Sequence, residues 1–293
     1  MYILKVYVII CREIFNEGIL YRKVVLCMRT LQEDIDYVLV RRHADVFSFL
    51  YSRTNEDLEL LFNNTDVMNK RVFSVLSSSD YLFSAIDAGA SVVDTFDINP
   101  LTYRYYHLRK WLLQLGYIDA EHLSVREVLE KLDEVLSIDF TESERVSFLF
   151  WKYYLSKNAD DRKLLYSDSL FLDISDSKVR YADNLKNIAT RLSLMDVGFQ
   201  TEDICMKASG TKDERYDTVF LSNILDHNRI GTSRLKIAQS NVSRMLSSDG
   251  RVVLSHFNFF PEIDTERRIF SKDFFYDELG YRDNVLYYQY VKK

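Results

Sequence analysis

The stretch RVFSVLSSSDYLFSAIDAGASVVDTFDINP, residues 71–100, decides the fold. It begins with the β-prone run RVFSVLS, which a polar serine turn separates from a helix-like segment that closes on Gly89. A second apolar run, Val92 to Asp97, ends in an acid, and Asn99-Pro100 then opens another helix. Strands and helices that alternate over such short connections predict a parallel sheet.

The same alternation resumes towards the C-terminus. Three further strands are expected at Leu194–Gln200, Tyr216–Asn223 and Gly250–His256, with a helix at about Ser233–Leu246. The last residues, NVLYYQYVKK, are interpreted as an edge strand with lysines at its exposed end. The expected fold class is therefore α/β, a mostly parallel twisted sheet with helices on both faces.

Helical segments precede and interrupt the sheet. From about Leu31 to Phe62 the pattern is helical, with Thr54 to Asp57 as a T-x-x-D capping box. A helical insert is expected at about residues 120–192. Its aromatic segment FLFWKYYL, from Phe148, predicts a core or lid helix, and a surface for a lipid is the alternative. The predicted division is an N-terminal extension with a helical segment, 1–65, and a sheet domain, 66–293.

Composition and charge exclude several classes of function. A net charge of −6 and a pI of about 5.5 provide no positive field for a nucleic acid, so no nucleic-acid partner is expected. The three cysteines show no CxxC spacing and the five histidines are scattered, so neither a metal site nor a disulfide framework is predicted. The apolar run Tyr7–Ile10 is shorter than the roughly 20 residues of a membrane span, and no signal-peptide pattern follows. We expect a cytoplasmic protein without an integral membrane segment.

Polar residues follow the predicted strands, where doubly wound sheets bind their ligands. Asp97 lies 20 residues beyond Ser77, a spacing that suits a strand-end acid that accepts hydrogen bonds from ribose hydroxyls. The alternative is that Asp97 caps the helix that starts near Pro100. The serine turn either supplies hydroxyls and N–H groups to a ligand or is an ordinary helix cap. The candidate binding residues at these strand ends are Ser77, Ser78, Ser79, Asp80, Asp97, Ile98, Asn99, Asp203 and Ser222.

Two later strand ends supply the remaining candidates. Asp203 follows the third strand, where an acid can accept a hydrogen bond from an adenine amino group, and a plain solvated loop is the alternative. In LSNILDH, polar residues emerge at the end of an apolar strand, where the floor of an active site is expected. If the site transfers a group, Asn223 is a candidate for hydrogen bonding to the amino or carboxylate end of that group, and Asp226 or His227 is a candidate base. A loop position without catalytic function is the alternative for His227.

Lys70–Leu113 and Tyr216–Asn228 together resemble the DUF3419 family, through the DINP turn, the helix behind it and the LSNILD strand end. That family includes the 3-amino-3-carboxypropyl transferases of betaine-lipid synthesis, which move this group from S-adenosylmethionine onto diacylglycerol. The resemblance implies a Rossmann-like class I methyltransferase fold with S-adenosylmethionine at the strand ends. The upstream YSRTNEDL resembles a TNEN-like segment of these relatives, which implies that Thr54 and Asn55 cover the cofactor.

The first loop departs from the family pattern. Relatives have a turn similar to G-S-S-G-D, whereas this chain has LSSSD at Leu76–Asp80, without the glycines that let a backbone approach its ligand. Three functions therefore stay open. The first is an S-adenosylmethionine-dependent transferase that moves an aminocarboxypropyl or methyl group to a small-molecule or lipid acceptor. The second is a non-catalytic binding or scaffold protein. An NAD-binding oxidoreductase ranks last, because a pyrophosphate requires the glycines more strictly.

Overall fold

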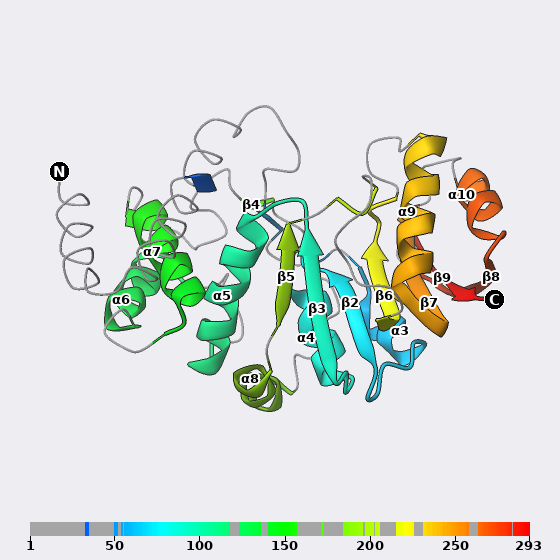
Figure 1. Cartoon of the computed structure of the whole chain (residues 1–293). Coiled ribbons are helices and arrows are strands. Elements are labelled where there is room, and N and C mark those ends of the chain that lie inside the picture. The colour runs from blue at the N-terminus through cyan, green and yellow to red at the C-terminus, as the bar shows by residue number, and fades with distance from the viewer. Residues whose placement is uncertain are drawn as a thin grey trace, which may run out of the picture.

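The computed structural model describes residues 33–34, 50–51, 54, 56–117, 123–135, 140–156, 171–172, 184–195, 197–201, 203–205, 215–225, 231–257, 263–282 and 284–293. Its main feature is a seven-stranded sheet with the order β5-β3-β2-β6-β7-β9-β8. The strands are β2 Arg71–Val75, β3 Val92–Asp97, β5 Gly198–Thr201, β6 Tyr216–Ser222, β7 Leu246–Phe257, β8 Phe274–Arg282 and β9 Val285–Lys292. The arrowheads of β5, β3, β2 and β6 point the same way in Figure 1.

The direction of the strands defines the fold. β2 pairs in parallel with β3 and β6, β5 joins β3 in parallel, and β7 joins β6 in parallel. β9 runs antiparallel to both of its neighbours, β7 and β8. Numbered along the chain, the order is 3-2-1-4-5-7-6 with the seventh strand antiparallel, the arrangement of the Rossmann-like class I methyltransferase fold. The predicted fold class is confirmed.

Helices cover both faces of the sheet. They are α3 Leu58–Asn63, α4 Asp80–Asp87, α5 Leu101–Gln114, α8 Leu185–Leu194, α9 Thr232–Met245 and α10 Ile263–Phe270. α4 packs against α3 and α8, while α9 packs against α10. Figure 1 shows α9 and α10 in front of the sheet and α3 and α4 behind it. Within the core, Phe73 of β2 stacks with both Phe96 of β3 and Tyr216 of β6.

A second core lies on the far side of α5. It is formed with α6 (Val125–Val135) and α7 (Glu142–Ser156), which lie beyond α5 at the β5 end of the sheet (Figure 1). Tyr105 and Leu108 of α5 are buried in this second core, while Tyr106 belongs to the main one. The aromatic segment is buried as well, which confirms the predicted core helix. Its buried members, Phe148, Phe150, Trp151 and Tyr154, therefore offer no apolar surface to a lipid.

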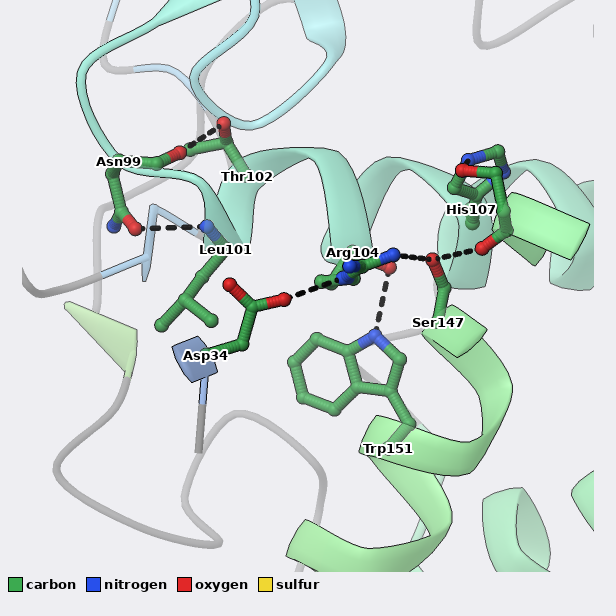
Figure 2. A network of polar contacts seen from close by, with 9 residues as sticks. Asp34, Asn99, Leu101, Thr102, Arg104, His107, Ser147 and Trp151 are labelled. Carbon is green, nitrogen blue, oxygen red and sulfur yellow. Dashed lines mark hydrogen bonds and ion pairs between the residues drawn. The ribbon is translucent and has the colours of Figure 1, made fainter. Parts of the chain in front are cut away.

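A buried polar network ties the N-terminal part of the chain to both helices (Figure 2). Arg104 of α5 forms an ion pair with Asp34 (Nε to Oδ2 2.8 Å) and donates to the Ser147 hydroxyl of α7. The Trp151 indole donates to the Arg104 carbonyl oxygen at 2.8 Å. Burial raises the pKa of Asp34 even though Arg104 lies beside it. Nearby, the short strand β1 (Leu50–Tyr51) pairs in parallel with β4 (Phe171–Leu172).

Two expectations are wrong at the ends of elements. β9 is not an edge strand, because β8, which was not predicted, pairs with its outer side, and Tyr287, Tyr288 and Tyr290 are buried. The expected capping box is absent, since Asp57 itself caps α3 by accepting from the Leu60 N–H at 2.9 Å.

The extension before Glu33 and most of the expected helix at residues 31–62 lie outside the described residues. None of the helices in the described part of the chain is long and apolar enough to cross a bilayer.

Candidate functional site

The carboxyl ends of β2, β3 and β6 meet at one edge of the sheet. β2 lies between the other two strands, because it pairs with β3 on one side and β6 on the other. The chain continues from β2 to β3 and from β6 to β7, in opposite directions across the sheet, so the strand order reverses between β2 and β6. Ligands of doubly wound sheets bind beyond the strands at this reversal.

Asp97 joins the loops that follow β2 and β3. Its two carboxylate oxygens accept hydrogen bonds from the backbone N–H groups of Ser77 (2.8 Å) and Asn99 (2.9 Å). Burial raises the pKa of Asp97 to about 6, and these hydrogen bonds offset part of the effect. The first N–H of α5, at Leu101, is bound by the Asn99 side chain instead, at 3.0 Å (Figure 2). Asp97 is therefore not the cap of this helix.

The serine turn has the backbone conformation that glycine favours. Ser77 has φ 45° and Ser79 has φ 75°, both in the left-handed region that residues with a Cβ adopt at a cost. Ser79 is fully buried, and its hydroxyl has no hydrogen-bond partner among the described residues. The loop thus has the shape expected of a glycine turn although it contains no glycine.

Asp80 holds the serine turn in place through buried hydrogen bonds and an ion pair. It is fully buried and accepts hydrogen bonds from the Thr54 N–H and the Ser78 hydroxyl, both at 2.7 Å. Arg109 of α5 forms an ion pair with it at 2.8 Å and also donates to the Ser78 carbonyl oxygen. The Arg109 guanidinium lies 5.2 Å from the ring centre of Phe83. Among the predicted residues, Thr54, Ser78 and Asp80 are therefore brought together by protein contacts.

Glu56 is a further residue of this edge, and it is absent from the sequence-based candidates. Its side chain is buried, and its Oε2 accepts from the hydroxyls of Tyr81 (2.8 Å), Ser222 (2.8 Å) and Thr54 (3.1 Å). Its Oε1 accepts from the Ser255 hydroxyl of β7. Burial and the neighbouring Glu56 raise the pKa of Tyr81 well above its ordinary value. The sequence signal for Glu56 was its place in the TNED segment, next to Thr54 and Asn55.

The remaining candidates lie at separate positions on the edge. Asp203, beyond β5, forms an ion pair with Arg234 of α9 (2.5 Å) and accepts a hydrogen bond from the Cys205 N–H (2.8 Å). Each of its carboxylate oxygens therefore already has a partner within the protein. Ser222 ends β6 with φ 56°, and the partly exposed Asn223 follows it. Ile98 exposes 42% of its surface beside Asp97. Asn55, Asp226 and His227 lie outside the described residues.

The chain is similar to known proteins only at the level of distant structural resemblance. No protein-family model matches it, and no curated protein matches it significantly. A TehB-like SAM-dependent methyltransferase from Corynebacterium glutamicum is similar in structure, with 10% identity, a TM-score of 0.40 and coverage of 92% of this chain and 99% of that one.

Two further solved structures are similar at the same level. The N-methyltransferase NodS from Bradyrhizobium japonicum, in complex with S-adenosyl-L-homocysteine, shows 8% identity, a TM-score of 0.40 and coverage of 91% and 98%. The PH0226 protein from Pyrococcus horikoshii shows 11% identity and a TM-score of 0.44, with coverage of 80% of this chain and 88% of that one. The resemblance to SAM-dependent methyltransferases is distant, and the fold itself follows from the order and direction of the strands.

Proposed function

We propose that the chain binds S-adenosylmethionine at the carboxyl ends of β2, β3 and β6 and transfers a group from it to an acceptor. The observation that carries this proposal is the position of Asp97. An acid at the end of the second strand, bonded to the loop after the first, stands where doubly wound sheets hold a ribose. A carboxylate suits this task because it only accepts hydrogen bonds and has about four lone-pair sites.

The neighbouring residues fit the other parts of this cofactor. Ile98 is exposed beside Asp97 and would pack against the adenine. The serine turn presents its backbone where the methionine part would lie, and Thr54 with Asn55 would cover it. Asp80, held by Arg109 and Ser78, keeps the turn in place and is not needed as a ligand. Asp203, the residue proposed for the adenine amino group, would have to share its carboxylate with Arg234.

The group transferred is proposed to be 3-amino-3-carboxypropyl, with methyl as the alternative. The support is the resemblance of the DINP and LSNILD segments to the DUF3419 family. When bound, S-adenosylmethionine supplies a sulfonium from which either group can leave. The side chains at the end of β6 would decide the outcome by the position in which they hold the acceptor, with Asn223 oriented towards it and Asp226 or His227 as base.

Calorimetric titration with S-adenosylmethionine and S-adenosylhomocysteine tests this proposal. The wild type is expected to bind both, and Asp97→Ala to weaken binding at least about tenfold, through the lost ribose hydrogen bonds. Asp94→Asn is the matched control, because Asp94 lies on the same strand, is equally buried at 8% exposure and pairs with Arg215 away from this edge. It is expected to bind like the wild type.

The reaction product separates the remaining alternatives. Release of methylthioadenosine would identify aminocarboxypropyl transfer, and release of S-adenosylhomocysteine would identify methyl transfer. Binding without either product, over a panel of small-molecule and lipid acceptors, would favour the non-catalytic protein. A wild type that binds neither ligand would refute the proposal as a whole.

A further inference from the structure

The Glu56 carboxylate contacts elements on both sides of the point where the strand order reverses, between β2 and β6. Tyr81, one of its donors, belongs to the helix that follows β2, and Ser222, another donor, ends β6. Ser255 connects the same carboxylate to β7. Because Ser222 is partly exposed, Glu56 lies one side chain away from the accessible part of this edge.

Four hydroxyl groups surround the buried Glu56 carboxylate. They donate to its two oxygens, and an ionised carboxylate is an acceptor only. A buried charge also acts over a longer distance than one in water, because the local dielectric constant is low. In its ionised form Glu56 adds negative potential to this edge, beside that of Asp97.

We propose that Glu56 gives this site its preference for a cationic ligand. The inference rests on the proposed function: S-adenosylmethionine carries a positive sulfonium, whereas S-adenosylhomocysteine has a neutral thioether at the same position. The Glu56 carboxylate acts electrostatically, through the shell formed by Ser222 and Tyr81, and so determines specificity without itself being a catalytic residue. It stabilises the bound sulfonium and contributes nothing to the binding of the neutral thioether.

The test is the ratio of the two affinities in Glu56→Gln, measured by calorimetry. This substitution keeps the size of the side chain and removes its charge. The ratio of the affinity for S-adenosylmethionine to that for S-adenosylhomocysteine is expected to fall about tenfold. A change of this size is expected when the attraction between the Glu56 carboxylate and the sulfonium is lost in a medium with a dielectric constant between those of water and of a dry protein interior. Affinity for S-adenosylhomocysteine itself is expected to change much less.

Glu266→Gln is the matched control. Glu266 of α10 is also a buried carboxylate that accepts from two tyrosine hydroxyls, Tyr288 at 2.8 Å and Tyr290 at 3.1 Å, but those belong to β9. This variant is expected to lower stability and to leave the affinity ratio unchanged. An equal fall in the ratio in both variants would show a general effect of buried charge and would overturn the proposal.

The remaining outcomes are also decisive. A folded Glu56→Gln with an unchanged ratio would show that Glu56 is structural only. If this variant does not fold, the wild type still tests the idea with sinefungin, whose amine stands in place of the sulfonium. The wild type must bind both cationic ligands more tightly than S-adenosylhomocysteine, and a preference for the neutral ligand overturns the inference. Failure to bind any of the three would instead refute the proposed function.

Discussion

Ser79 has a backbone conformation that a glycine would adopt without strain. A residue with a Cβ in the left-handed region costs about 1 kcal/mol, and the unpartnered, buried Ser79 hydroxyl among the described residues adds to this. Ser79→Gly is therefore expected to raise the free energy of unfolding by about 1 kcal/mol, measured by urea denaturation.

Ser78→Gly is the control for this prediction. Ser78 is next to Ser79, but its φ is not positive and its hydroxyl donates to Asp80 at 2.7 Å. Its loss should lower the free energy of unfolding by about 1 kcal/mol. If Ser79→Gly destabilises the protein as much as Ser78→Gly does, the turn is not strained as we describe.

The raised pKa of Asp97 should make the free energy of unfolding and the affinity for the ligand depend on pH in opposite directions. Its folded-state pKa of about 6 lies above the ordinary value of 3.8. The protonated form is thus favoured by folding, and its stabilising contribution, complete below about pH 4, is lost as the pH rises through about 6. A ribose requires the ionised form as acceptor. Affinity for S-adenosylhomocysteine should therefore fall about tenfold between pH 7 and pH 5.

Calorimetry at several pH values checks this prediction. Asp97→Asn should bind weakly at every pH and lose the dependence between about pH 5 and pH 7, because it has no proton to gain. An affinity of the wild type that stays constant over this interval would mean that the Asp97 carboxylate does not contact the ligand.

At the scale of elements, the ion pair between Asp80 and Arg109 connects the first loop to α5. Both side chains are buried, at 0% and 3% exposure, and removal of one partner of a buried ion pair is strongly destabilising. Arg109→Met should lower the free energy of unfolding by about 3–5 kcal/mol. Lys152→Met, which breaks an exposed pair with Asp133 between α7 and α6, should lower it by less than about 1 kcal/mol. Equal losses in chemical denaturation would contradict this assignment.

The sequence predicted elements best where one local pattern determines them. The strand at Val92–Asp97 has the predicted bounds, since an apolar run between a glycine turn and an Asn-Pro pair allows little else. The position of β9 could not be predicted, because whether a strand is an edge depends on a neighbour. That neighbour, β8, has mostly exposed or partly exposed residues and shows no clear alternation.

For the candidate site too, the sequence predicts local features and not contacts between distant segments. The 20-residue spacing predicted a strand-end acid that binds a ribose. The structure places Asp97 at the end of β3, bonded to the loop after β2, and ribose binding stays a prediction. Glu56 escaped prediction because two of its donors, Ser222 and Ser255, are 166 and 199 residues away. Contacts of that kind depend on the folded sheet, and the local signal for Glu56 was limited to its place in the TNED segment.

At the scale of the whole molecule, two cores share α5 as a common wall. Leu132 of α6 is fully buried in the second core, far along the chain from the strand-end residues. Leu132→Ala should destabilise that core by about 2–5 kcal/mol. Hydrogen exchange should show faster opening of α6 and α7, with the β2 and β3 amides protected as before. Equal loss of protection in the sheet would show that the two cores unfold as one unit.

A crystal structure of the protein with S-adenosylhomocysteine would show whether the edge formed by β2, β3 and β6 is the binding site that we propose for S-adenosylmethionine. We expect ligand density at these strand ends, with ribose hydroxyls within hydrogen-bond distance of Asp97 and the adenine against Ile98. Density elsewhere on the protein, or an empty edge at saturating ligand, would contradict this proposal.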